Sequence, residues 1–170
     1  MAYTISEINE MDQAAFVGAL GHLFEHSPWV ASETYSQRPF ESAKVLHEAL
    51  CATLARASTE SQLELIRAHP DLAGRLAQAG QLTAASTAEQ ASAGLNRMAT
   101  EELEKFQALN ARYKDRFGFP FVICARLNDK ATIEKAIVAR LENSPELERA
   151  AALREIEKIA WLRLTDLLTS

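Results

Sequence analysis

Residues 100–118 read TEELEKFQALNARYKDRFG, and this stretch decides the fold class more clearly than any other part of the chain. Its apolar residues recur every three or four positions, which is the spacing of the buried face of a helix. They are Leu103, Phe106, Leu109, Tyr113 and Phe117. Thr100 is of a type that caps helix N-termini, and Gly118 is of a type that ends helices. The stretch therefore predicts a long amphipathic helix.

The same spacing predicts helices through most of the remaining sequence. They are expected at residues 16–24, 42–54, 59 to about 69, about 72–79, onward from 86, about 129–141 and onward from 144. Two pairs have capping-box spacing, Thr59 with Gln62 and Ser86 with Glu89. No strand alternation and no repeat of about 20 to 50 residues is present. We therefore predict an all-α, single-domain irregular bundle of about seven to nine helices over residues 1–170.

The composition indicates an ordered, soluble protein and argues against several kinds of partner. Of 170 residues, 48% are hydrophobic and 24% are charged, which suits one domain with a substantial core. The net charge is −5 and no block of Lys or Arg occurs, so a nucleic-acid partner is not expected. No stretch approaches the roughly 20 apolar residues of a membrane span, so no membrane partner is expected either.

The compartment is inferred from cysteine usage and from the chain ends. Cys51 and Cys124 are too few for a disulfide framework, which fits a reducing compartment. Glu7 and Glu10 stand where a signal peptide needs positive charge, and the last residues are not a Ser-Lys-Leu peroxisomal address. We therefore expect a cytoplasmic protein.

Four segments hold the residues best suited to chemistry. They are Glu25-His26-Ser27-Pro28-Trp29, His69-Pro70-Asp71-Leu72-Ala73-Gly74, Ser86 through Gln90, and Phe117-Gly118-Phe119-Pro120-Phe121. Arg163 is added to them because its helical phase places it on the apolar side of the last helix. Each motif alone is weak evidence, but their order and spacing together are specific.

In this order and spacing the segments resemble the 2-oxo-4-hydroxy-4-carboxy-5-ureidoimidazoline (OHCU) decarboxylase family, whose members show His-Pro-Asp-Leu, Ser-x-x-Glu-Gln and Phe-Gly-Phe-Pro-Phe signatures. The resemblance implies an all-helical homodimer that uses no metal and no organic cofactor and converts a small ureidoimidazoline into (S)-allantoin. It assigns catalytic roles to His69, Glu89 and Arg163. It also implies that the substrate contacts Pro70, Ser86, Thr87, Ala88, Glu89, Gln90, Phe121, Val122, Ile123, Cys124 and Ala125.

Each candidate catalytic residue also has a plain structural explanation. His69 before a proline could simply cap a helix end, although a pKa near 6.5 suits histidine for proton transfer. Glu89 could be the third residue of a capping box begun by Ser86. Arg163 on an apolar face must meet a carboxylate, carbonyl groups or an anionic ligand, so a structural salt bridge competes with substrate binding.

Other residues receive weaker interpretations. His22 and His26 are four residues apart, a spacing that could share a metal ion on a helix, but no third ligand pattern accompanies them. Cys124 follows buried-type residues, so packing is expected rather than nucleophilic chemistry. The phenylalanines at 117, 119 and 121 could build the core or a pocket wall. The alternative functions are a non-catalytic helical interaction module and a metal-dependent hydrolase.

Overall fold

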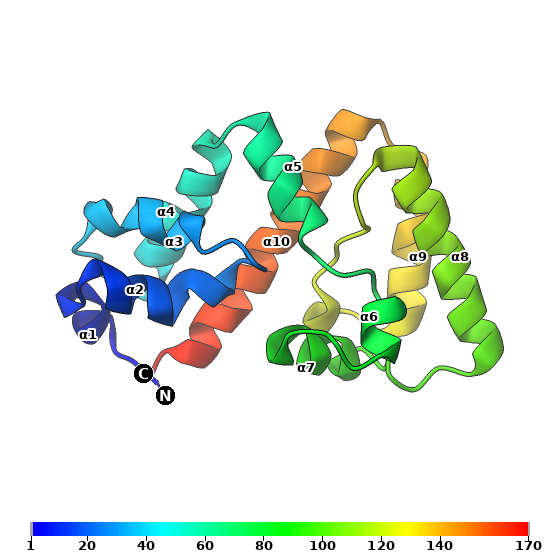
Figure 1. Cartoon of the computed structure of the whole chain (residues 1–170), viewed down its shortest axis with the longest axis horizontal. Helices are drawn as coiled ribbons and strands as arrows, with labels where there is room; N and C mark the ends of the chain where they lie inside the picture. Colours follow the sequence, from blue (N-terminus) through cyan, green and yellow to red (C-terminus); the bar gives the residue numbers. More distant parts are fainter. Residues whose placement is uncertain (1, 170) are drawn as a thin grey trace. The chain divides into compact units, whose positions relative to one another are not determined.

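The all-α prediction is confirmed. The computed structural model describes residues 2–169, apart from the side chains of Arg75 and Leu76. Its α-helices are α1 (Ile5–Glu10), α2 (Gln13–Leu20), α3 (Trp29–Thr34), α4 (Ala43–Arg56), α5 (Thr59–Arg67), α6 (Arg75–Gln78), α7 (Ala84–Ser92), α8 (Thr100–Phe117), α9 (Lys130–Arg140) and α10 (Pro145–Leu167). Short 3-10 helices are η1 (Gly21–Leu23), η2 (Tyr35–Gln37) and η3 (Ala125–Leu127) (Figure 1). Helices α1 and α3 are additions to the segments expected from the sequence.

The helices form two compact units. Unit 1 comprises residues 1–68 and 157–170, and unit 2 comprises residues 69–156. Helix α10 contributes its first part to unit 2 and its last part to unit 1. The two ends of the described chain meet within unit 1, where the Tyr3 N–H donates to the Leu167 carbonyl and the Thr169 N–H donates to the Tyr3 carbonyl (Figure 1).

Unit 1 is organised around helix α3, which packs against both α2 and α4. Phe16, Leu20, Val30, Leu46 and Leu50 are completely buried. The Phe16 ring meets the Tyr35 ring edge-on at 5.5 Å between centroids. Burial of these large apolar side chains is the main favourable contribution to the stability of such a unit.

Unit 2 has an aromatic core. The Tyr113 ring from α8 lies 4.5 Å from the Phe117 ring, 6.1 Å from the Phe119 ring and 5.3 Å from the Phe121 ring, measured between centroids. All four side chains are buried. The predicted inner face of α8 is therefore confirmed at Phe106, Leu109, Tyr113 and Phe117. The phenylalanines at 117, 119 and 121 pack in the core. The run from Phe119 to Cys124 has no helix or strand assignment.

Some helix ends match the sequence prediction and others correct it. Ser42 caps α4, Asp129 caps α9, and Gly118 ends α8 with φ +76°, a conformation that glycine adopts without strain. The two predicted capping boxes are wrong, because Ser58 caps α5 and Thr83 caps α7. Each capping side chain accepts an N–H three residues ahead, so the helix begins earlier than predicted.

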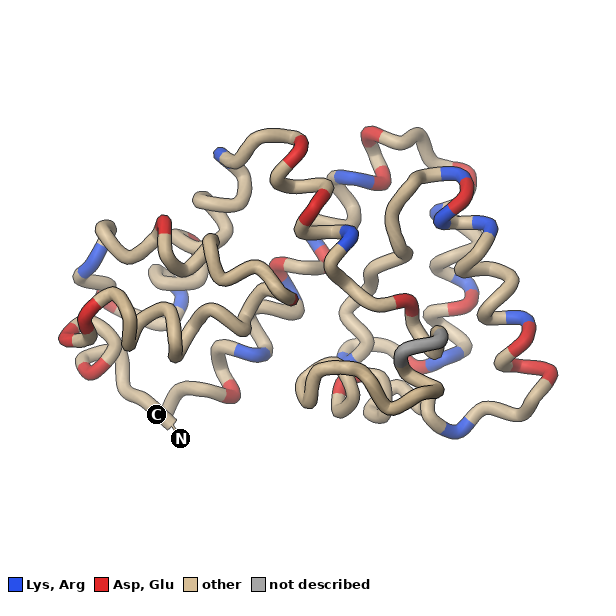
Figure 2. Tube along the Cα trace, viewed as in Figure 1, with Lys and Arg blue, Asp and Glu red and all other residues tan. Residues whose placement is uncertain are grey.

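Charged residues are spread along the chain. Figure 2 shows acidic and basic positions interspersed on the helices, and its coloured part has no continuous basic segment. No helix in the described part of the chain is long and apolar enough to span a membrane.

Candidate functional site

The loop that carries His69 is fixed by two neighbouring helices. Helix α5 ends at Arg67 with Ala68 as its C-cap, and His69 follows with 8% of its surface exposed. The Ala73 N–H donates to the Gln90 Oε1 of α7 at 2.9 Å, and the Asn110 Nδ2 of α8 donates to the Leu72 carbonyl at 2.7 Å. These bonds hold the His-Pro-Asp-Leu segment to α7 and α8.

The turn of this loop depends on its backbone geometry. Ala73 has φ +51°, a left-handed backbone conformation that residues other than glycine rarely adopt. A Cβ atom added to Gly74 would lie 2.6 Å from the Asp71 Cβ, so glycine is required there. The Asp71 Oδ2 also accepts from the Lys114 Nζ at 3.1 Å. The strained turn is therefore held by contacts on both sides, as strained backbone at functional loops usually is.

Helix α7 presents one part of the predicted contact set inward and the other part outward. Ser86 and Gln90 are buried and Glu89 is half-buried, so these three share one face. Thr87 and Ala88 are exposed, and the Thr87 hydroxyl donates to the Thr83 carbonyl at 2.9 Å. Glu89 is the sixth residue of α7, so the expected capping role is wrong and its carboxylate does not sit at the helix N-terminus.

The third segment of the predicted site, residues 121–125, is buried; residues 121–124 have no regular structure and Ala125 begins η3. Helix α7 packs against η3, which brings this stretch beside the helix of Glu89. The Arg140 Nη1 donates to the Val122 carbonyl at 2.8 Å, and the Cys124 N–H donates to the Glu155 Oε1 at 3.3 Å. Within the described part of the chain, the backbone N–H and carbonyl of Ile123 have no hydrogen-bond partner. Buried backbone groups are normally paired, so Ile123 is suited to meet a polar ligand.

Cys124 belongs to the wall of this region and is not poised as a nucleophile. The residue is 1% exposed. Burial raises the pKa of the thiol above its usual range, and the charges of Glu155 and Glu89 act in the same direction. The packing role expected for Cys124 therefore fits the structure.

Arg163 lies in unit 1 and makes a buried ion pair. Its Nη2 donates to the Glu25 Oε2 at 2.8 Å and its Nη1 donates to the His22 carbonyl at 3.1 Å. Arg163 is 6% exposed and Glu25 is 3% exposed, so the predicted inward phase of Arg163 is confirmed. Glu25 is the residue whose role sequence reasoning missed, although an acidic residue directly after Leu23 and Phe24 was a visible signal.

The histidines considered as metal ligands do not share a helix. His22 lies in η1, and His26 lies beyond it at φ +48°, so the expected helical pairing of the two rings is wrong. The turn before Pro28 ends the helical segment earlier than the spacing implied. Among the residues that the structure describes, no group of three or more His, Cys, Asp or Glu side chains could hold a metal ion.

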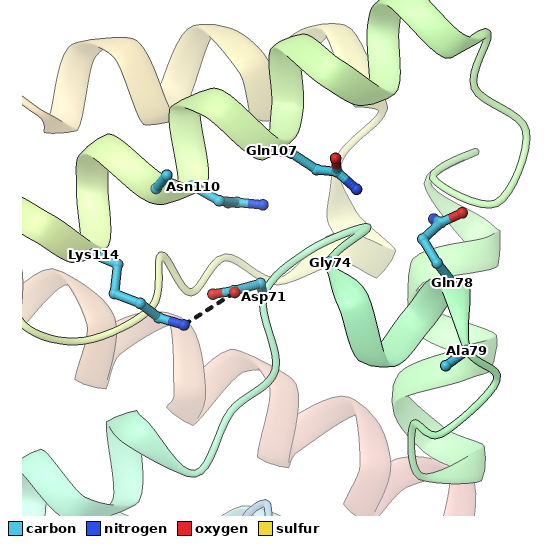
Figure 3. A pocket seen from close by; sticks show the side chains of 8 residues that line it. Asp71, Gly74, Gln78, Ala79, Gln107, Asn110 and Lys114 are labelled. Carbon is cyan, nitrogen blue, oxygen red and sulfur yellow. Dashed lines mark hydrogen bonds and ion pairs between the residues drawn. The ribbon is translucent and has the colours of Figure 1, made fainter.

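A cavity of about 720 Å³ lies in unit 2 beside the His-Pro-Asp-Leu loop (Figure 3). It is lined by Asp71, Gly74, Gln78, Ala79, Gln107, Asn110, Ala111 and Lys114. Figure 3 shows the Lys114 ammonium bonded to the Asp71 carboxylate at one end and Gln78 at the other. Among the described residues, none of those predicted as catalytic or substrate-contacting lines this cavity, which lies instead between part of the loop, the end of α6 and α8.

Three of the predicted segments therefore lie in unit 2. Arg163 is paired in unit 1 with Glu25, which belongs to the remaining segment. The sequence matches the model of a known protein family along almost its whole length. The chain belongs to the OHCU decarboxylase family, whose model matches residues 9–165. The expected family, and with it an enzyme of the lyase class, is confirmed.

Named relatives support the same assignment. The 2-oxo-4-hydroxy-4-carboxy-5-ureidoimidazoline decarboxylase of Mus musculus is 44% identical over 162 residues, covering 95% of this chain and 91% of that protein. The uric acid degradation bifunctional protein PucL of Bacillus subtilis (strain 168) is 40% identical, covering 98% of this chain and 33% of that protein. The crystal structure of an (S)-allantoin synthase superposes with a TM-score of 0.80 at 30% identity. That match covers 99% of this chain and 54% of the crystallised one.

Proposed function

We propose that the chain decarboxylates 2-oxo-4-hydroxy-4-carboxy-5-ureidoimidazoline to (S)-allantoin during urate degradation. The observation that carries this proposal is the 44% identity to the mouse OHCU decarboxylase over nearly the full length of both chains. The similarity to a bifunctional protein of uric acid degradation and to an (S)-allantoin synthase supports the same pathway and product.

The chemistry of this substrate explains why we propose an enzyme without a cofactor. Many decarboxylases need a cofactor to accept the electron pair left by CO2. In the ureidoimidazoline, the carbon that bears the carboxylate and the hydroxyl adjoins a C=N carbon. The electron pair released with CO2 can enter that imine and give an enol-like intermediate. The hydroxyl then becomes a carbonyl as a proton is delivered to the neighbouring carbon.

The last proton sets the stereocentre of allantoin, so the protein must deliver it to one face. We propose that His69, oriented or assisted by Glu89, handles the hydroxyl proton and the relayed protonation. The burial of His69 and the packing of α7 against η3 support a site shielded from bulk water in unit 2. A positioned acid–base group of this kind typically contributes about 10²–10⁴-fold to the rate.

We propose that Arg163 binds the anionic substrate and steadies developing charge. Its guanidinium is permanently charged, and Glu25 fixes its orientation through a bond of 2.8 Å. The proposed substrate contacts are Pro70, the segment from Ser86 to Gln90, and the segment from Phe121 to Ala125. The backbone of Ile123, which has no hydrogen-bond partner among the described residues, supports the last of these.

Three further properties belong to the same proposal. The family resemblance favours a homodimer, which light scattering of the purified protein can test. The two free cysteines favour a reducing, cytoplasmic compartment. Helix α10, shared by both units, favours a single domain over residues 1–170.

The experiment that tests the function follows circular dichroism. The protein is added to freshly oxidised urate that has passed the preceding hydrolase, and the appearance of one allantoin enantiomer is recorded. Rapid formation of the (S) form supports the proposal, whereas a racemate forming at the uncatalysed rate contradicts it and favours a helical interaction module. Activity should survive exhaustive chelation and dialysis. Activity that chelation removes and zinc restores would overturn the cofactor-free mechanism.

A further inference from the structure

Arg140 links the predicted substrate segment, residues 121–125, to a buried carboxylate. It is the last residue of α9, and its side chain is 14% exposed. One edge of the guanidinium faces the substrate segment, where Nη1 donates to the Val122 carbonyl at 2.8 Å. The guanidinium carbon also lies 4.4 Å from the centroid of the Phe121 ring. Arg140 therefore contacts two consecutive residues of that segment.

Glu148 fixes the other edge of the same guanidinium. Its side chain is completely buried in the first turns of α10. Its Oε1 accepts from the Arg140 Nε at 2.8 Å and from the Tyr113 hydroxyl, and its Oε2 accepts from the Asn143 Nδ2 at 2.9 Å. A buried carboxylate with this many donors has one well-defined orientation, which it passes on to Arg140.

The Tyr113 hydroxyl is a permanent donor to this carboxylate. Burial raises the pKa of Tyr113 far above its usual range, and the hydrogen bond to Glu148 acts in the same direction. Tyr113 also packs edge-on against Phe121, with 5.3 Å between the ring centroids. The network therefore contacts the beginning of the substrate segment in two ways, through the hydrogen bond to the Val122 carbonyl and through the Phe121 ring.

We propose that Arg140, oriented by Glu148, is a positioning residue that holds the backbone of residues 121–125 in the conformation that binds the substrate. The proposal rests on the function proposed above. Neither residue belongs to the contacts predicted from the sequence, and both act through the Val122 carbonyl rather than by touching the substrate. Arginine is required because a planar fork reaches the carboxylate and the carbonyl together, whereas a lysine ammonium serves one of them.

The test compares variants that keep the buried charge balanced with a matched control. In R140M/E148M both partners of the pair become apolar, which avoids leaving one buried charge unpaired. R140K retains a charge for Glu148 but loses the fork. R38M is the control, because the Arg38 Nη1 also donates to backbone carbonyls and Arg38 also lies over a ring, that of Tyr35, but in unit 1.

Two readouts are measured on each folded variant: steady-state kinetics with the ureidoimidazoline, and amide hydrogen exchange of residues 119–127 by mass spectrometry. We expect R140M/E148M to raise KM about tenfold with kcat changed less than about threefold, and to speed exchange in this segment about tenfold, as a displaced binding segment predicts. R140K should move both readouts in the same direction by less, and R38M should move neither.

Each outcome decides a separate point. Unchanged exchange and unchanged KM in R140M/E148M and R140K would overturn the positioning role. A fall in kcat alone, with normal KM and normal exchange, would also overturn it. Should R140M/E148M fail to fold, R140K carries the same comparison. A wild-type protein that does not turn over the ureidoimidazoline would refute the proposed function, while the exchange measurement still reports on the positioning of residues 121–125.

Discussion

The guanidinium of Arg163 and the carboxylate of Glu25 form an ion pair at 2.8 Å in which neither residue is more than 6% exposed. A buried pair of this kind is weakly stabilising as a whole, because desolvation offsets the attraction between the charges. Loss of one partner is costly, because it leaves the other charge buried. The stability of unit 1 and the proposed anion binding therefore depend on the same side chain.

The first prediction separates these two roles of Arg163. Arg163→Met should lower the free energy of unfolding by about 3–5 kcal/mol, because the buried Glu25 carboxylate loses the ion-pair partner that lies 2.8 Å from it. The double variant R163M/E25M should recover most of that loss. If Arg163 binds the substrate, turnover stays low in the double variant, as urea denaturation and kinetics on the same samples will show. Recovery of turnover together with stability would limit Arg163 to a structural role.

The second prediction concerns His69 and Glu89. His69→Gln should lower kcat by about 10²–10⁴-fold with little change in KM, because a proton-transfer group acts in the transition state. Glu89→Gln should lower kcat in the same direction by less if it orients the imidazole. Ala84→Ser is a suitable control, because Ala84 is the exposed first residue of the same helix and lies outside the proposed substrate contacts. Near-normal turnover in His69→Gln would exclude His69 as the principal acid–base group.

The sequence predicts which segments form helices better than it predicts the residue at which each helix begins. The apolar spacing of α8 and the glycine at 118 specified that helix nearly to the residue, because periodicity and a left-handed end are local properties. Helix α1 was missed although Thr4 and Glu7 form a capping box, since its six residues are too few for a clear periodicity. At α5 and α7 several polar residues competed for the cap, and spacing alone chose the wrong one.

The site residues remain a prediction, and the structure adds their burial. Sequence order does not say which side chains of a helix face inward, and the structure shows Ser86 and Gln90 buried and Thr87 and Ala88 exposed. The sequence does not predict hydrogen-bond partners that lie far apart along the chain. Glu25 is 138 positions from Arg163, and Arg140 is 18 positions from Val122. Such pairs arise from tertiary packing, which no local pattern encodes.

The third prediction tests the backbone at two exposed glycines. A Cβ atom at Gly118 would meet nothing within 4 Å, but φ is +76°, so Gly118→Ala should cost about 1–2 kcal/mol through backbone strain alone. Gly18 also has open space and lies inside α2, so Gly18→Ala should stabilise the protein by about 0.4–1 kcal/mol. Urea denaturation measures both. Equal effects of the two substitutions would contradict this assignment of cause.

The fourth prediction uses the Cys51 thiol, whose pKa is raised from about 9 to about 12 by burial and by the charges of Glu157 and Glu48. The folded state keeps the proton after the unfolded state has lost it, so the stability contributed below pH 9 is lost as the pH rises toward 12. The stability of wild type relative to Cys51→Ala should therefore fall over this range. A difference between the two proteins that stays constant would show that the thiol pKa is not raised on folding.

The fifth prediction is that the two units unfold together. Both tryptophans, Trp29 and Trp161, belong to unit 1, whereas far-UV circular dichroism reports the helices of both units. Helix α10 continues through Ile156 and Glu157, and its buried residues on either side of that point tie its two halves to separate cores. Fluorescence and dichroism should therefore give the same urea midpoint.

The Gly118→Ala variant makes this test sharper, because the substitution lies in unit 2 and far along the sequence from both tryptophans. In a single cooperative domain, strain in unit 2 lowers the midpoint seen by tryptophan fluorescence as much as the midpoint seen by dichroism. Gly18→Ala, in unit 1, should raise both midpoints together in the same way. If Gly118→Ala shifts only part of the dichroism curve and leaves the fluorescence curve unchanged, the units unfold independently and residues 1–170 do not form one domain.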